Sequence, residues 1–220
     1  MDTGQIAGLL EPFLEQPLTL PALQQISTYI NLLLRWNARI NLTAIRRKEE
    51  IVPRHFGESL FLARHLFPAG GTDQRLRTTD HCIRVLDIGS GAGFPGLPLK
   101  IWAPQIQLMM IESNHKKAAF LREAARALTL TDIDVITERA EIVAARPDFP
   151  RAEIVTLRAV ESFEAILPVA KSLLARNGTL ALLIGTSQVT RLETLSDIQW
   201  QPPITVPKSS QRVLSIGVLP

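Results

Sequence analysis

The sequence predicts an α/β protein in which a parallel sheet carries helices on both faces. Beyond about residue 80, short apolar runs of strand length alternate with segments of helical periodicity, which is the pattern of a doubly wound sheet. A glycine-rich turn directly follows the first of these runs. The last two runs are so close in the chain that they must form an antiparallel hairpin.

Composition supports one folded domain with an extension. The chain has 220 residues, of which 46% are hydrophobic, and no apolar run approaches the roughly 20 residues of a membrane span. The segment Met1–Gln5 lacks the basic and apolar regions of a signal peptide, and the single Cys82 cannot form an internal disulfide. We therefore expect a cytoplasmic protein, without membrane contact and monomeric. The net charge of +3 permits a nucleic acid partner without demanding one.

Residues 1–66 carry apolar residues at helical spacing and predict helices. The first helix contains Ile6 and ends before Pro17, and Thr19 can cap the second. Pro53 can begin the third.

Two polar stretches interrupt this region. The charged run 46–50 either connects two helices or starts the third, and 68–79, with two adjacent glycines, predicts an exposed linker. We place the domain boundary there, with a helical extension and linker at 1–79 and the α/β domain at 80–220.

The α/β domain is expected to contain seven strands. Five are predicted at 83–88, 106–112, 132–137, 152–158 and 179–184, with helices at 95–102, 114–128, 161–176 and 187–196. The hairpin strands are 200–206 and 212–218, separated by Pro207 and a polar turn.

The glycine turn follows the first strand and predicts a nucleotide-type cradle at the carboxyl end of that strand. Its glycines are Gly89, Gly91, Gly93 and Gly96. The last three fit the dinucleotide fingerprint, which is a weak pattern alone. The first three, preceded by Asp87, resemble the first motif of S-adenosylmethionine-dependent methyltransferases, in which a carboxylate can meet the ammonium group of the cofactor. A glycine-rich turn without a ligand is the remaining alternative.

Acidic and basic side chains follow the next strands. Glu112 ends the second strand, where an acid can accept hydrogen bonds from ribose hydroxyls; the alternative is a surface carboxylate. After the third strand, Ala140 can offer a backbone N–H to an adenine and Glu141 an acceptor, although Glu141 can equally cap a helix. Arg158 closes the fourth strand and can contact a cofactor carboxylate or an RNA phosphate, unless a neighbour such as Glu161 pairs with it.

Other residues indicate how RNA would bind. The candidates are Arg46, Arg47, Arg54, His55, Lys116 and Lys117. A solvated charged surface, and for His55 a structural role, are the alternatives. We expect no metal site, because no His, Cys and Asp cluster has ligand spacing.

Missing motifs narrow the reaction that such a site could catalyse. No Asp/Asn-Pro-Pro-aromatic motif for amine methylation follows the fourth strand, and Cys82 is far from any thiolate position. An acceptor that is already nucleophilic, such as guanine N7, remains possible and requires alignment and electrostatics but no general base. No catalytic residue is then needed, with Arg158 as the possible exception.

Several short motifs together resemble one family along nearly the whole chain. They are Trp36-Asn37 with Asn41-Leu42-Thr43, Arg54-His55 with Ser59, Asp87 to Pro98, Lys116-Lys117 with Phe120-Leu121, and Arg158-Ala159. The set is similar to the small-subunit (16S) ribosomal RNA guanine-N(7) methyltransferases, once called glucose-inhibited division protein B. Glu58 stands where that family usually has Asp, and Ile184-Gly185 stands where Lys-Gly is common.

The resemblance implies a Rossmann-like, seven-stranded methyltransferase sheet and transfer of a methyl group from S-adenosylmethionine to one guanine of small-subunit ribosomal RNA. The substrate would be the RNA itself or a pre-assembled small subunit. By similarity the cofactor contacts are Gly89, Phe94, Ala140, Glu141 and Arg158. Two other hypotheses stay open: an NAD-dependent oxidoreductase and a non-catalytic ribosome-assembly factor.

Overall fold

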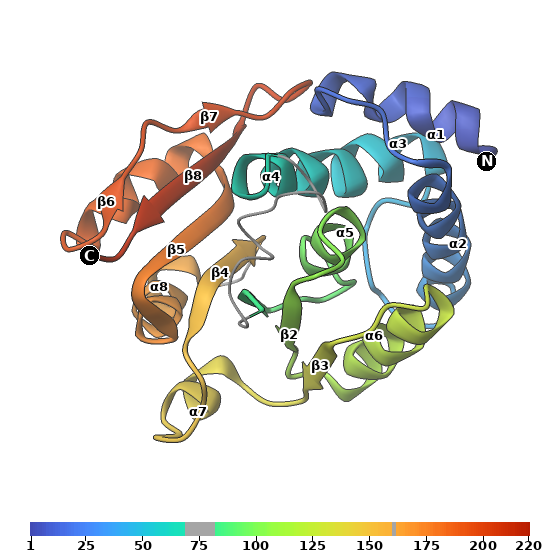
Figure 1. Ribbon diagram of the computed structural model, residues 1–220. Helices are drawn as coiled ribbons and strands as arrows, with labels where there is room; N and C mark the ends of the chain where they lie inside the picture. The colour runs from blue at the N-terminus through green and yellow to red at the C-terminus, as the bar shows by residue number, and fades with distance from the viewer. Residues whose placement is uncertain (69–81, 160–161) are drawn as a thin grey trace.

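A central sheet separates two helical layers in the computed structural model, which describes residues 1–68, 82–159 and 162–220 (Figure 1). Its strands are β1 (Arg84–Ile88), β2 (Gln107–Ile111), β3 (Ile133–Ile136), β4 (Ala152–Arg158), β5 (Leu174–Gly185), β6 (Gln199–Trp200), β7 (Ile204–Thr205) and β8 (Arg212–Val218). The order is β3-β2-β1-β4-β5-β8-β6, and β7 also pairs with β8. Strands β1 to β5 are parallel and β8 is antiparallel to β5. The order reverses between β1 and β4, whose carboxyl ends therefore flank the usual ligand position of such sheets.

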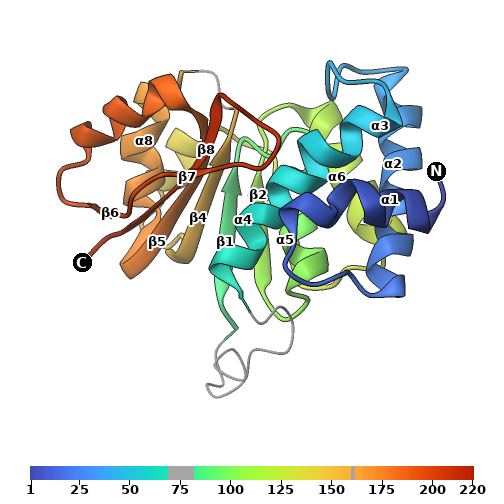
Figure 2. The ribbon, with the colours of Figure 1, turned by 90° about the horizontal axis from the view of Figure 1, so that it is seen from above.

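Helices cover both faces of this sheet. In chain order they are α1 (Thr3–Leu10), the 3₁₀ turn η1 (Glu11–Phe13), α2 (Leu20–Asn37), α3 (Lys48–Ile51), the π-helical η2 (Val52–Gly57), α4 (Glu58–Leu66), α5 (Gly96–Trp102), α6 (His115–Ala127), α7 (Ala140–Ala144), α8 (Phe163–Ser172) and the 3₁₀ segment η5 (Thr186–Thr194). Figure 2 shows α1, α2, α4, α5 and α6 on one side of the strands and α8 on the other. None of the helices in the described ranges is long and apolar enough to cross a membrane.

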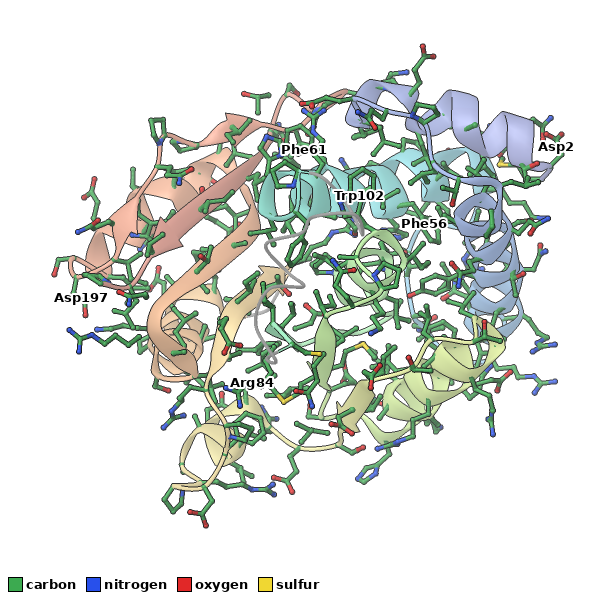
Figure 3. All side chains as sticks on the ribbon, in the orientation of Figure 1. Asp2, Phe56, Phe61, Arg84, Trp102 and Asp197 are labelled. Atoms are coloured by element: carbon green, nitrogen blue, oxygen red, sulfur yellow. The ribbon has the colours of Figure 1, made fainter. Side chains whose placement is uncertain are left out.

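The helical extension shares its hydrophobic core with the sheet. Ile26 and Tyr29 of α2 and Leu60 of α4 belong to the same buried cluster as Leu97 of α5 and Phe120 of α6. The labelled Phe56, Phe61 and Trp102 in Figure 3 lie among these helices. A second cluster on the opposite face joins the strands to α7, α8 and η5. Residues 1–66 therefore form part of one helical layer over the sheet. The predicted boundary at 79 and, apart from Pro68, the predicted linker 68–79 lie outside the described residues.

The predicted cap at Thr19 is confirmed, and the structure adds a second cap at Asn114. The Thr19 hydroxyl accepts a hydrogen bond from the Ala22 N–H at 3.4 Å and caps α2, whose first turn contains a proline. At α6 the Asn114 side chain accepts from the N–H groups of Lys116 and Lys117 at 2.9 and 3.2 Å. These caps fix where each helix begins.

The structure corrects the predicted strand over 200–206. Pro202 and Pro203 have no N–H to give to a sheet, and they divide this segment into β6 and β7. Both pieces run antiparallel to β8, so the predicted hairpin is present. In the described part of the chain the sheet has eight strands instead of the predicted seven.

Helical predictions need correction as well. The third helix begins at Lys48 and contains Pro53, whose missing N–H is accommodated by the π-helical η2, where the Glu58 N–H bonds to the Pro53 carbonyl. The helix predicted at 187–196 is the 3₁₀ segment η5, which ends at Thr194. Residues 174–176 belong to β5 rather than to the preceding helix, and the short α7 is absent from the predicted helices.

Candidate active site

A cavity of about 740 Å³ opens at the carboxyl edge of the sheet, beside the reversal of strand order. Its walls come from the turn after β1, the ends of β2 and β4, the start of α7, and the segments 42–45 and 54–55 of the extension. Most of the predicted cofactor residues line it, namely Gly89, Gly91, Phe94, Glu112, Ala140, Glu141 and Arg158. A volume of this size suits a cofactor or small ligand.

The glycine turn presents bare backbone to this cavity. Gly89 and Gly91 have φ of 68° and 55°, in the left-handed region that favours glycine. A Cβ placed on Gly91 would find only the Gly89 carbonyl oxygen within 4 Å, at 3.8 Å. Any side chain at Gly91 would therefore project into space that a ligand can use.

Gly93 has a different role from the one predicted. It does not line the cavity, and with φ of 85° its added Cβ would overlap the Tyr29 hydroxyl and lie 2.7 Å from Leu97 Cδ1. Tyr29 donates a hydrogen bond to the Ala92 carbonyl and stacks on Phe94 with ring centroids 5.2 Å apart. The absence of a side chain at Gly93 thus lets α2 pack against the turn.

Asp87 does not line the cavity either. Its carboxylate is fully buried and accepts hydrogen bonds from the Thr156 hydroxyl at 2.9 Å and the Gly96 N–H at 3.3 Å. Burial raises the pKa of Asp87 to about 6, although these hydrogen bonds oppose the rise. The geometry does not support a direct meeting with a cofactor ammonium group; the carboxylate joins β1, β4 and α5.

Glu112 supports the turn from β2. One carboxylate oxygen accepts from the Gly91 N–H at 2.8 Å and the other from the Asn114 N–H at 2.8 Å. The residue is only 7% exposed, so the surface-carboxylate alternative is wrong. Each oxygen keeps a second lone pair that can accept from a ligand hydroxyl.

The start of α7 forms another wall. Arg139 is the N-cap of this helix, so the N–H of Ala140 belongs to the first turn, which has no intrahelical acceptor. Glu141 lies in the same turn and also lines the cavity. Both interpretations of Glu141, helix start and ligand contact, are therefore compatible with its position.

Arg158 is held by the extension. Its guanidinium forms an ion pair with Glu58 at 3.1 Å and donates to His55 Nδ1 at 3.0 Å. Burial, together with Arg212 and Arg54, lowers the pKa of Arg158 to about 10, while Glu58 opposes the fall. Its Nε–H is buried and has no acceptor in the described part of the chain. The suggested partner Glu161 lies outside the described residues.

His55 and Thr43 continue this network into the cavity wall. Burial and the neighbouring Arg158 lower the pKa of His55 to about 3, so the ring is neutral near pH 7. An arginine can only donate, so Nδ1 accepts and the proton resides on Nε2, which donates to Thr43 Oγ1 at 2.7 Å. A neutral ring engaged at both nitrogens favours the structural role of His55 over phosphate contact. Thr43 was recognised only within the Asn-Leu-Thr motif, and it lines the cavity.

The predicted RNA-binding cations are not all at this site. Arg54 and Lys117 line the cavity, whereas Arg46 and Lys116 are exposed elsewhere on the surface. Arg47 is exposed and forms ion pairs with Glu49 at 3.9 Å and Glu50 at 3.5 Å.

Arg212 is a cavity residue that sequence reasoning missed. It starts β8, and because β8 runs antiparallel to β5 its first residue pairs with Gly185 at the carboxyl edge of the sheet. The predicted antiparallel hairpin was the available signal, since the beginning of such a strand must lie beside the ends of its parallel neighbours. Within 1–68, 82–159 and 162–220 no group of His, Cys, Asp and Glu could hold a metal ion.

Comparison with known families identifies the chain. The family model GidB, described as rRNA small subunit methyltransferase G, matches residues 22–201. The chain belongs to this family. A relative from Chromobacterium violaceum named ribosomal RNA small subunit methyltransferase G is 35% identical over 91% of this chain and 88% of its own. A relative of the same name from Xylella fastidiosa (strain 9a5c) is 37% identical over 82% and 78%.

Solved structures show the same fold at low sequence identity. Cofactor-bound Rv0187 from MTB superposes with a TM-score of 0.62 at 16% identity, covering 89% of both chains. Ribosomal protein L11 methylase from Lactobacillus delbrueckii gives 0.53 at 16% identity, covering 73% of this chain and 78% of that one. The predicted methyltransferase-type α/β fold and the predicted family are thereby confirmed. The comparisons lend no support to the oxidoreductase or the non-catalytic assembly factor.

Proposed function

We propose that this protein transfers the methyl group of S-adenosylmethionine to N7 of a guanine in small-subunit ribosomal RNA. The observation that carries the proposal is the open glycine turn at Gly91, which faces one cavity together with Glu112 and Arg158. Membership of the methyltransferase G family supports the same conclusion, since the relatives are named for small-subunit ribosomal RNA.

The cavity residues match the parts of S-adenosylmethionine. Glu112 has free lone pairs for ribose hydroxyls, and the Ala140 N–H with Glu141 can meet the adenine edge. The Nε–H of Arg158, which has no acceptor among the described residues, can donate to the carboxylate of the cofactor. Gly89 and Gly91 leave room for the methionine portion. The bound cofactor supplies a methyl group on a positively charged sulfur.

Guanine N7 suits a site without a general base. Its lone pair is free and carries no proton, so no group in the cavity must remove one. The protein then has to align the base with the methyl group and exclude water. His55 agrees with this interpretation, because a ring with a pKa near 3 that is hydrogen-bonded at both nitrogens is poorly suited to proton transfer.

The extension supplies the surface that would receive RNA. Thr43 and Arg54 come from it and line the same cavity as the cofactor residues. A folded RNA or an assembled small subunit can therefore approach over the extension and place one base beside the glycine turn.

We propose that a single protein molecule is sufficient for this reaction. We also propose a cytoplasmic location, as expected for an enzyme that modifies ribosomal RNA.

Calorimetry with two cofactors tests the first half of the proposal. Purified protein should bind S-adenosylmethionine and show no heat with NAD. Binding of NAD alone would revive the oxidoreductase hypothesis.

Methyl transfer tests the second half. Small subunits and naked ribosomal RNA from cells lacking the activity should accept methyl groups from S-adenosylmethionine, and primer extension should locate the modified guanine. RNA binding without any transfer, at every assembly stage tried, would instead indicate an assembly factor.

A further inference from the structure

A second cavity of about 450 Å³ adjoins the first one. Arg54, Ala159 and Arg212 line both, so the two cavities meet at these residues. The remaining wall comes from the end of β5, the first residues of η5 and the turn before β8, namely Leu183, Gly185, Gln188, Lys208, Ser209, Ser210 and Gln211. Its described lining includes three cationic side chains and no Asp or Glu.

Positive charge in this region exceeds the negative charge that faces it. Glu58, only 2% exposed, forms ion pairs with both Arg54 at 3.3 Å and Arg158 at 3.1 Å. Arg212 and Lys208 form no ion pair with any residue that the structure describes. Glu58 therefore offsets the charge of Arg54 and Arg158, whereas Arg212 and Lys208 keep theirs, and the wall of the second cavity is suited to an anion.

The other groups in the wall are hydrogen-bond donors. The side-chain oxygen of Gln188 accepts from the Gly185 N–H at 2.9 Å, which leaves its NH₂ group free to donate. Ser209 and Ser210 add hydroxyls beside Lys208. Guanidinium, ammonium, hydroxyl and amide donors without a competing carboxylate form a set that recognises phosphate oxygens.

We propose that the second cavity is a phosphate subsite for the RNA backbone next to the methylated guanosine. Resting on the proposed function, this inference assigns the base to the first cavity and a neighbouring phosphate to the second. Arg54 and Arg212 contact the phosphate at the junction, and Lys208 contacts it from the hairpin turn. A nucleoside and its phosphate are covalently joined, which matches two cavities that share a wall.

Substitution of Lys208 tests the subsite because this residue does not line the cofactor cavity. Lys208→Ala should raise the KM for small subunits roughly five- to ten-fold and Lys208→Glu more, with kcat and the affinity for S-adenosylmethionine unchanged. The slope of log K for RNA binding against log salt should become shallower by about 0.7 to 0.9 in Lys208→Ala. Lys208→Arg should restore most of the loss. Arg176→Ala, which removes an exposed cation near the start of β5 at the opposite edge, is the matched control and should match wild type.

The outcomes separate this inference from the proposed function. If the wild-type protein transfers methyl groups and Lys208→Ala has the same KM and salt slope, the subsite is overturned and the proposed function stands. A loss of cofactor affinity in Lys208→Ala would also overturn it, because the cavity would then serve the cofactor. Absence of methyl transfer by the wild-type protein would overturn the proposed function and the subsite together.

Discussion

Gly91 and Gly93 lie two residues apart in one turn, yet they face different parts of the molecule. An added Cβ would face the open cavity at Gly91 and the Tyr29 hydroxyl at Gly93. Sequence alone assigned both to the cofactor, because the spacing of glycines does not reveal which ones face a ligand and which ones face a helix. The packing partner of Gly93 comes from a distant part of the chain.

Substitutions at these glycines should therefore separate binding from stability. Gly91→Val is expected to abolish measurable cofactor binding, at a cost of about 1–2 kcal/mol in unfolding free energy for its left-handed backbone. Gly93→Ala should lower the unfolding free energy by about 2–4 kcal/mol, since it also meets Tyr29 and Leu97. Calorimetry and urea unfolding measure the two effects. Cofactor affinity in a folded Gly91→Val protein equal to that of wild type would mean that the site is misplaced.

Asp87 gives a pH-dependent prediction. Its pKa is about 6 in the folded protein and 3.8 in the unfolded chain, so between these values the folded state holds a proton that the unfolded state lacks. The contribution of Asp87 to the unfolding free energy is therefore lost as pH rises from about 4 to 6. Between pH 4 and pH 7, the unfolding free energy of Asp87→Asn relative to that of wild type should therefore increase by about 1–3 kcal/mol. A difference that stays constant with pH would contradict the assigned pKa.

His55 acts in the opposite direction over nearly the same range. Its pKa is about 3 in the folded protein and 6.5 in the unfolded chain, so its contribution is present above pH 6.5 and is lost as pH falls toward 3. Both proteins in the Asp87 comparison retain His55. Its effect therefore cancels in the difference, which isolates the carboxylate.

At the scale of elements, α2 supports the glycine turn through one side chain. Tyr29 is fully buried, donates to the Ala92 carbonyl and stacks on Phe94. The extension thus supports the glycine turn at which we propose that the cofactor binds.

Tyr29→Phe tests this support while keeping the ring. The variant leaves the Ala92 carbonyl without its partner and should lose about 1–2 kcal/mol of unfolding free energy, with a several-fold weaker affinity for S-adenosylmethionine. Thr28→Ala, at an exposed position of the same helix, is the control and should change neither quantity. A Tyr29→Phe protein with unchanged stability and affinity would show that the turn does not depend on α2.

Elements were predictable where local chemistry decides them. Apolar runs predicted β1 to β4 within a few residues, and Thr19 caps α2 as predicted. The predictions are wrong where prolines or tertiary packing determine the backbone conformation. Pro53 lies within a π-helical turn, and the sixth predicted strand is divided into two. A short helix such as α7 gives too few residues for a periodic pattern.

At the scale of the whole molecule, topology explains which site residues the sequence could reveal. Residues that follow parallel strands, such as Glu112 and Arg158, were predictable because the ends of these strands share one edge. Thr43 and Arg212 reach the same cavity through the packing of the extension and the reversed direction of β8. The predicted hairpin could have indicated Arg212, whereas the packing of the extension that brings Thr43 to the cavity follows from no local pattern in the chain.

One reaction can identify both the donor and the atom that accepts the methyl group. The most direct measurement incubates the protein with tritiated-methyl S-adenosylmethionine and small subunits that lack the modification, followed by digestion of the RNA to nucleosides. We predict that the label elutes as 7-methylguanosine and that Gly91→Val gives none. Label in another nucleoside, or no label from wild-type protein that binds the cofactor, would contradict this account.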